Sequence, residues 1–233
     1  MKITYLGQAG VLFETNGLRI VVDPYLSDSC GAQNPAQHRR QRINEAYLNL
    51  SPQVVICTHC HLDHLDPETL RHYLTPEGNV TAMAPGEGWR KLREFGGKNN
   101  YVLFNRHVEW TQGQAHFRAV KAVHSDPDAV GVILEAEGGR WYLSGDTLYS
   151  EEIFQDVQGH FDGVFLPING VGNNMNMTDA ARFAAKLDAD WVVPMHVGMF
   201  DALDAAEFSA PNRIVPRIYE EIPVAGRAGR KET

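Results

Sequence analysis

The stretch Thr-His-Cys-His-Leu-Asp-His-Leu-Asp, residues 58–66, brings four side chains able to bind a metal into six consecutive positions. They are His59, His61, Asp63 and His64. The apolar run 54–57 predicts a short buried strand that ends where they begin. In an extended segment, side chains two positions apart lie on the same side, so His59, His61 and Asp63 would point the same way. The turn that follows would bring His64 beside Asp63. One loop could then bind two adjacent metals, His59 and His61 binding the first and Asp63 and His64 the second.

The same cluster could be a solvated polar loop. The surrounding sequence favours a metal site, because the start of a predicted helix follows the cluster. Asp66 is a suitable N-cap, Pro67 suits the first helical position, and Glu68 lies in the first turn. A buried strand before the cluster and a helix after it are the context that a metal motif requires. Imidazole and carboxylate together suit zinc, manganese or iron.

Three further residues with side chains able to bind a metal each follow a predicted strand. They are His124 after the strand 117–123, Asp146 after 141–145, and His196 after 191–195. Taken alone, Asp146 could be a turn-forming residue in Gly-Asp-Thr. The other histidines, His38, His72, His107, His116 and His160, are expected to have no ligand role.

The pattern Thr-His-x-His-x-Asp-His at 58–64 resembles the signature of the metallo-β-lactamase superfamily of binuclear metal hydrolases. The later ligands of that family are a His, an Asp that bridges both metals, and a last His. The resemblance therefore implies two divalent ions, Mn²⁺ or Zn²⁺, held by His59, His61, Asp63, His64, His124, Asp146 and His196. It also implies an αββα sandwich of two mixed β-sheets flanked by helices, with the metal site at one edge. Periodicity alone predicts only a mixed α/β domain.

Alternating patterns and turn residues predict the individual elements. The expected strands are 2–6, 11–15, 18–22, 54–57, 80–84, 101–104, 108–110, 117–123, 130–136, 141–144, 164–167 and 191–195, and the expected helices are 67–74, 87–95 and 178–187, the last capped by Thr178. Asn16-Gly17 predicts a hairpin turn. The segment 25–49 is polar and predicts no element. A chain of 233 residues can bury one substantial core, so we expect a single domain, 1–233.

Composition narrows the class of protein. Hydrophobic residues make up 43% and charged ones 21%, as in soluble globular proteins. The net charge of -8 argues against binding nucleic acid or an anionic membrane, although bound metals could still attract a small anionic substrate. No signal peptide or membrane span is visible, so a cytoplasmic location is expected. Three cysteines do not predict a disulfide framework, and Cys57-x-x-Cys60 is a poor redox pair because Cys57 lies in a strand.

Two segments are candidates for substrate contact. The Gly/Asn/Met-rich loop 168–177 offers Asn169, Asn173 and Asn174 as amide contacts in a pocket wall, with an ordinary long turn as the alternative. The basic run 38–42 is usually a solvated face or an oligomer contact. Alternatively, Arg39, Arg40 or Arg42 would hold an anionic substrate near the metals.

The motifs at 58–66, 144–150 and 174–196 resemble the L-ascorbate-6-phosphate lactonase (UlaG-like) group. That group comprises cytoplasmic, manganese-dependent hydrolases that act on a phosphorylated sugar lactone and form higher oligomers, although the lactonase is considerably longer than this chain. The sequence does not decide the oligomeric state, and a homo-oligomer is one possibility, for which apolar residues near Trp110, Met199 and Phe200 could provide contacts, although the last two could instead line the pocket. The Irving–Williams order favours zinc over manganese in a nitrogen-rich site, so the sequence does not decide which of the two metals is bound.

The ligand set also implies a mechanism. Two divalent ions would generate a hydroxide at neutral pH, and the hydroxide would attack the substrate carbonyl. Asp63 would orient that hydroxide and accept its proton, and His196 would lie near the leaving group. A phosphodiesterase or phospholipase-type hydrolase on the same fold is the main alternative. A diiron redox protein typically has Glu in the first motif, whereas this chain has Asp63, and a non-catalytic module would lack one or more ligands.

Overall fold

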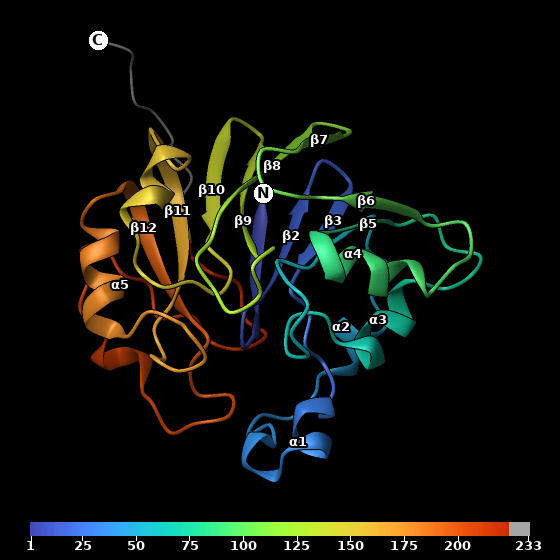
Figure 1. Ribbon diagram of the computed structural model, residues 1–233, viewed down its shortest axis with the longest axis horizontal. Coiled ribbons are helices and arrows are strands. Elements are labelled where there is room, and N and C mark those ends of the chain that lie inside the picture. The colour runs from blue at the N-terminus through green and yellow to red at the C-terminus, as the bar shows by residue number, and fades with distance from the viewer. Residues whose placement is uncertain (224–233) are drawn as a thin grey trace.

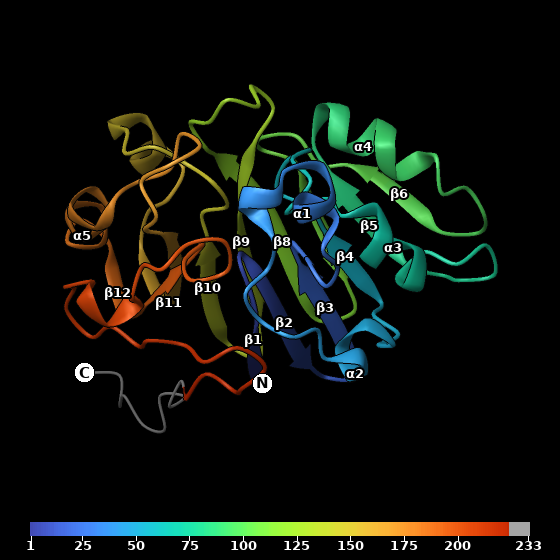
Figure 2. The ribbon, with the colours of Figure 1, turned by 90° about the horizontal axis from the view of Figure 1, so that it is seen from below.

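Two six-stranded β-sheets stack face to face, and helices cover both outer faces (Figure 1 and Figure 2). The computed structural model describes residues 1–223, so residues 224–233 of the predicted domain 1–233 lie outside the described part. Both sheets mix parallel and antiparallel pairs. The predicted αββα sandwich is therefore confirmed.

The first sheet has the strand order β1-β2-β3-β4-β5-β6. Its strands are β1 (Lys2–Gly7), β2 (Gly10–Thr15), β3 (Leu18–Val22), β4 (Val54–Ile56), β5 (Thr81–Ala84) and β6 (Asn100–Leu103). The first three strands are antiparallel, and β3 to β6 are parallel. Asn16 and Gly17 join β2 to β3 with φ values of 46° and 79°, which confirms the predicted hairpin turn.

The second sheet has the strand order β12-β11-β10-β9-β8-β7. Its strands are β7 (Glu109–Gln112), β8 (Ala115–Lys121), β9 (Val130–Ala136), β10 (Gly139–Leu143), β11 (His160–Pro167) and β12 (Asp188–Met195). Pro194 fits within β12 because that strand lies at the edge of the sheet, where a missing backbone N–H is tolerated.

Three apolar layers hold the sandwich together. Between the sheets, Phe13 packs edge-on against Trp141 and Phe165, with ring centroids 6.3 and 6.0 Å apart. Helices α3 (Pro67–Tyr73) and α4 (Gly86–Arg93) cover the outer face of the first sheet, and α5 (Met177–Ala184) covers that of the second. Asp66 caps α3 as predicted, whereas Asn176 and not Thr178 caps α5, because its side chain accepts the N–H of Asp179.

The polar segment 25–49 does contain short helices that the pattern did not predict. They are α1 (Ser29–Gln33), the 3₁₀ helix Pro35–Gln37 and α2 (Glu45–Leu48); further 3₁₀ turns span Glu151–Gln155 and Ala205–Glu207. Each is too short to show an apolar period in the sequence.

One edge of the sandwich collects the ends of several strands. Strands β8 and β10 run in the same direction because both are antiparallel to β9, and β11 and β12 are parallel to β10. The carboxyl ends of β8, β10 and β12 therefore lie at one edge. The short helix α1 lies beyond this edge, at the bottom of Figure 1.

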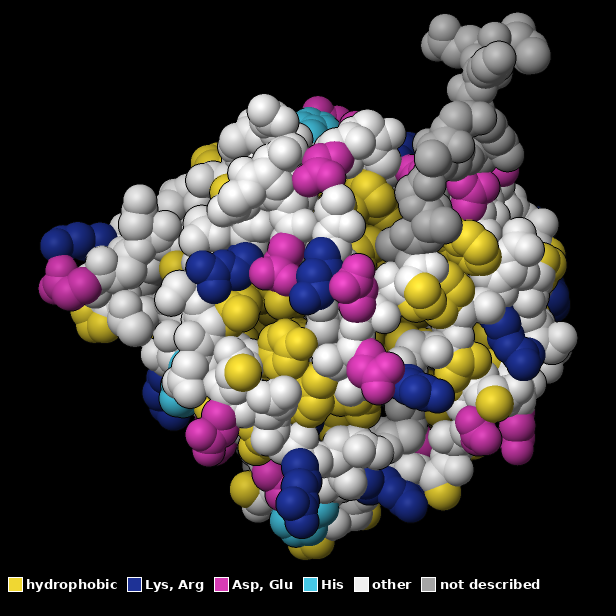
Figure 3. Space-filling view, turned by 180° about the vertical axis from the view of Figure 1, so that it is seen from behind, with side chains coloured by type: hydrophobic (Ala, Val, Ile, Leu, Met, Phe, Trp, Pro, Cys, Tyr) yellow, Lys and Arg dark blue, Asp and Glu magenta, His cyan; other side chains and the backbone are white. Residues whose placement is uncertain are grey.

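The rear face mixes side chains of both charges (Figure 3). Lys and Arg side chains alternate there with Asp and Glu, so this face has no broad area of one sign. Among residues 1–223, no helix combines the length and hydropathy needed to cross a bilayer.

Candidate metal centre

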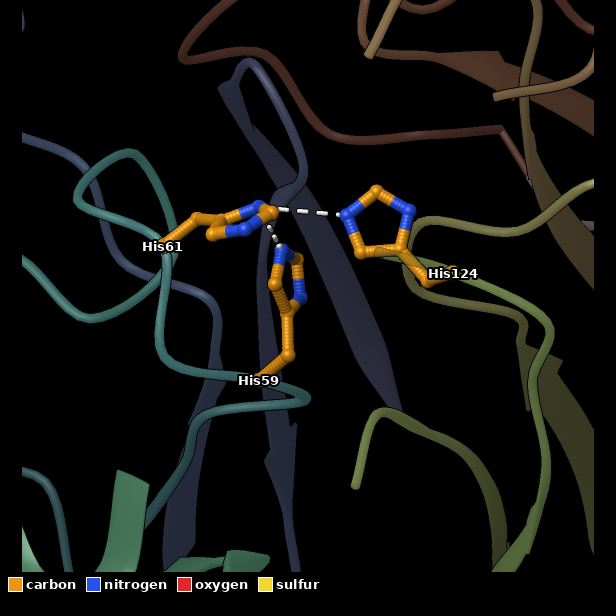
Figure 4. A group of neighbouring side chains, drawn as sticks. All are labelled: His59, His61 and His124. Atoms are coloured by element: carbon orange, nitrogen blue, oxygen red, sulfur yellow. Dashed lines mark hydrogen bonds between the residues drawn. The ribbon is translucent and has the colours of Figure 1, made fainter. Parts of the chain in front are cut away.

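Three imidazoles converge at the edge where the strands end (Figure 4). Nε2 of His59 lies 3.0 Å from Nδ1 of His61, and Nε2 of His124 lies 3.1 Å from the same atom. His59 and His61 come from the loop after β4, whereas His124 follows β8. These three nitrogens, from two separate segments, make a suitable face for one metal ion.

A second group lies beside the first. Nε2 of His196 lies 3.1 Å from Oδ2 of Asp63, and Nε2 of His64 lies 3.6 Å from that oxygen. Asp146 lies between the two groups, with Oδ1 at 3.3 Å from His64 Nε2 and Oδ2 at 3.2 Å from His196 Nε2 and 3.9 Å from His124 Nε2. The structure thus brings all seven predicted ligands close together, with Asp146 between the two sets.

The path of the first loop differs from the expectation. Residues 57–66 form a series of turns and not an extended strand, because the N–H groups of His64 and Leu65 both bond to the carbonyl of His61. These turns still separate His59 and His61 from Asp63 and His64.

Unsatisfied buried atoms indicate that this arrangement fits divalent cations. His64 Nε2 and Asp146 Oδ1 are both buried and have no hydrogen-bond partner among the described residues, although they lie 3.3 Å apart. Polar atoms buried in this way are costly unless a partner satisfies them. The donor set of imidazole nitrogens and carboxylate oxygens matches zinc, manganese or iron.

The electrostatics divide the histidines into two kinds. Burial, and then the neighbouring His64, holds the pKa of His59 well below its usual range. Burial would also lower the pKa of His196, but Asp146 and Asp63 outweigh it and raise that pKa to about 10. Burial would likewise lower the pKa of His64, but the charges of Asp146 and Asp23 outweigh it and raise that pKa well above its usual value. In the protein without ions, the second group therefore holds protons that a metal would replace.

A buried carboxylate that the motif does not contain orients one of the ligands. Oδ2 of Asp23 accepts hydrogen bonds from Nδ1 of His64 at 2.8 Å and from Oγ1 of Thr58 at 2.7 Å. Its other oxygen accepts the N–H of Thr58 at 2.7 Å. This contact fixes the ring so that Nε2 faces Asp146.

Gln8 ties the first turn of the chain to the last ligand. Its carbonyl accepts the N–H of His196 at 2.7 Å, and its side-chain Nε2 donates to Oδ2 of Asp63 at 2.8 Å. Both Gln8 and His196 have positive φ values, 53° and 57°, which non-glycine residues adopt at a cost. These bonds stabilise the unusual backbone and present both side chains to the site.

The three asparagines predicted to contact substrate have different surroundings in the structure. Asn174 is buried, and its Nδ2 donates to Oδ2 of Asp146 at 2.9 Å. Asn173 is exposed, and its backbone carbonyl lies 3.2 Å from Nδ1 of His124. Only Asn169 of the three lines the cleft described next.

The metal groups open into a cleft of about 530 Å³, which we call the metal cleft. It is lined by Gln8, Cys30, Gln33, Gln37, His61, Leu62, Asp63, Ser125, Asp146, Asn169, Val171, Gly172, His196, Phe200 and Asp201. Amide side chains and carboxylates dominate its polar walls, and no Lys or Arg of residues 1–223 lines it.

The basic run 38–42 therefore does not reach this cleft. Arg39 instead donates to the carbonyls of Tyr25 and Ser27, at 2.8 and 3.1 Å, and its guanidinium lies over the Tyr25 ring. Arg40 and Arg42 are exposed. Met199, one of the expected oligomer contacts, is fully buried in a small apolar cluster with Tyr25, whereas its neighbour Phe200 lines the metal cleft.

Sequence reasoning missed Gln8, Asp23 and Asp126. Asp126 is buried and accepts the backbone N–H of Cys60 at 3.0 Å, which ties the first metal loop to the loop that carries His124. In the sequence, Gln8 and Asp23 look like ordinary turn residues at strand ends. Their position at the same sheet edge as the predicted ligands was the available signal.

Comparisons with known proteins agree with this geometry. A family model described as a beta-lactamase superfamily domain matches residues 2–196. The UPF0173 metal-dependent hydrolase of Geobacillus thermodenitrificans is 30% identical over 215 residues, covering 86% of this chain and 87% of the relative. The corresponding hydrolase of Geobacillus sp. strain WCH70 is 29% identical over 218 residues, covering 87% and 88%. The solved structure of Igni18, a metallo hydrolase from Ignicoccus hospitalis, superposes with a TM-score of 0.74 at 22% identity, covering 95% of this chain and 97% of that one.

Proposed function

This chain belongs to the β-lactamase superfamily, in which its relatives are metal-dependent hydrolases, and on this premise we propose that it uses two divalent cations to open the ring of a sugar lactone. One observation carries the proposal: Asp146 lies between two sets of ligand atoms, and the site opens into the metal cleft. When bound, the two cations would lower the pKa of a water molecule and polarise a substrate carbonyl.

The side chains around the cations supply the remaining tasks. Asp63 has one carboxylate oxygen fixed by the Gln8 amide at 2.8 Å, and it faces the cleft, where it can orient the attacking water and accept its proton. His196 lies 3.1 Å from the same oxygen and would lie near the leaving group. Opening a lactone releases no second fragment, so the leaving oxygen stays attached to the product.

The walls of the metal cleft support a hydroxylated substrate. Gln8, Gln33, Gln37 and Asn169 offer amide donors and acceptors that suit sugar hydroxyl groups. The resemblance of the motifs at 58–66, 144–150 and 174–196 to the L-ascorbate-6-phosphate lactonase group supports the same substrate class. A small polyhydroxylated lactone is therefore the substrate class that we propose.

Metal reconstitution with a substrate panel tests this function. Protein purified without added ions would be loaded with Mn²⁺ or Zn²⁺ and assayed on sugar lactones with and without phosphate, and on bis(p-nitrophenyl) phosphate. We expect lactone opening that requires the metal and is lost in Asp146→Asn. If every lactone is inert while the phosphodiester is cleaved, the lactonase proposal is wrong and the phosphodiesterase alternative replaces it.

A further inference from the structure

A second and larger pocket adjoins the metal cleft. This side pocket, of about 700 Å³, shares Gln33, His61 and Leu62 with the metal cleft, so the two adjoin at a metal ligand. Its other walls come from the first metal loop and from helices α3 and α4. Nothing in the ligand set explains why a pocket of this size opens beside His61.

The two pockets differ in charge. The metal cleft has carboxylates from Asp63, Asp146 and Asp201 and no Lys or Arg of the described residues. The side pocket contains Arg71 and Lys91 together with Glu87 and Glu94. Arg90 pairs with Glu87 at 2.9 Å, so Glu94 is the carboxylate of the side pocket that forms no ion pair among residues 1–223.

Lys91 is the distinctive residue of the side pocket. It is half-buried, and its Nζ donates to the carbonyl of Cys60 at 3.3 Å, directly before the ligand His61. Neither Lys91 nor Arg71 has a carboxylate partner among residues 1–223. A half-buried ammonium that forms no ion pair can still bind an anionic ligand, and such charge-assisted bonds are strong.

The side pocket also has apolar walls. Leu62, Leu65 and Phe95 line the same pocket and can pack against a neutral stem. A substrate that lies across His61 would thus place an uncharged, reactive part over the metals and a charged end beside Lys91.

We propose that the side pocket binds a phosphate group remote from the reacting carbonyl of the substrate, through Lys91 with help from Arg71. This inference rests on the proposed lactonase function and specifies where the charge of a phosphorylated lactone lies. Lys91 acts in recognition and does not touch the reacting carbonyl.

Calorimetry on the metal-loaded protein tests the pocket without turnover. The probes are 6-phosphogluconate and gluconate, which differ only in the phosphate. We expect the phosphorylated acid to bind at least about tenfold more tightly to the wild type. Lys91→Met should abolish that preference, Lys91→Arg should retain most of it, and Arg93→Gln, a cation on the same helix that does not line the pocket, should leave it unchanged.

The opposite results overturn the proposal. They are an equal affinity of the wild type for both acids, or a preference that survives in Lys91→Met, which would place the phosphate on the metals. Hydrolysis of the two corresponding lactones separates this failure from that of the proposed function. If neither lactone is opened while the binding preference depends on Lys91, the lactonase assignment is wrong and the anion pocket stands. If both are opened with no dependence of KM on Lys91, the pocket assignment is wrong and the lactonase stands.

Discussion

Asp23 and His64 form a buried pair in which Nδ1 of the imidazole lies 2.8 Å from Oδ2 of the carboxylate, and both side chains are at least 98% buried. The pair joins the end of β3 to the metal loop after β4. Because the ring is held at Nδ1, its other nitrogen is directed toward Asp146.

Asp23→Asn is therefore expected to weaken metal binding. An amide can present a donor to Nδ1 and favour the wrong tautomer, so His64 would lose its fixed orientation. Changes at such supporting residues typically lower metal affinity by about 10- to 100-fold. Competition with a chromophoric chelator measures the affinity, with Asp188→Asn as an exposed control. An unchanged affinity for both ions would show that Asp23 is not needed to orient the ligand.

The sequence predicts the ligand residues better than it predicts the residues that hydrogen-bond to them. Ligand residues follow strands at a recognisable spacing, and the turns after β4 preserve that sorting even though the segment is not extended. Asp23 and Gln8 carry no such spacing, and their role depends on β3, β4 and β12 ending at one edge. The basic run 38–42 left two interpretations open, a solvated or oligomer face and an anion site, and only tertiary contacts decide for Arg39, which they place against Tyr25.

Metal binding should release protons near neutral pH. Asp146 and Asp63 raise the pKa of His196 to about 10, and the pKa of His64 is also raised well above its usual value, so both rings are protonated at pH 7.5 without ions. A metal binds only the neutral ring, so about two protons should leave. Calorimetric titration with Zn²⁺ in buffers of different ionisation enthalpy measures this number. A binding enthalpy that does not depend on the buffer would contradict the prediction.

The metal-free protein should lose stability as the pH rises above neutral. The folded pKa of His196, about 10, exceeds its ordinary value of 6.5, so protonation of this ring favours the folded state. That contribution is complete below about pH 6.5 and is lost as the pH approaches 10. Thermal unfolding followed by circular dichroism between pH 6 and 10 should show a falling Tm. The fall should be smaller in His196→Gln and unchanged in the control His72→Gln, and a Tm that does not vary with pH in the wild type would contradict this.

Arg39 is expected to support the fold and not the substrate. Its guanidinium donates to two backbone carbonyls and lies over the Tyr25 ring, so Arg39→Ala leaves buried acceptors unpaired. We expect a loss of about 1–3 kcal/mol in the free energy of unfolding. Urea denaturation measures it, and Arg42→Ala, at an exposed position in the same run, should change stability by less than about 0.5 kcal/mol. Equal effects of the two substitutions would mean that the contacts of Arg39 contribute little.

The neighbours Asn173 and Asn174 have the same sequence context but should respond differently to substitution. Nδ2 of Asn174 is buried and donates to Oδ2 of Asp146 at 2.9 Å, whereas the side chain of Asn173 is exposed. Asn174→Ala should therefore free the carboxylate that lies between the two ligand sets, lower the affinity for metal and reduce stability by about 1–3 kcal/mol. Asn173→Ala should leave both quantities nearly unchanged, because its contact with His124 uses the backbone carbonyl. Chelator competition and urea denaturation of the two variants test this, and a larger effect at Asn173 would show that the exposed amide, and not the buried one, supports the centre.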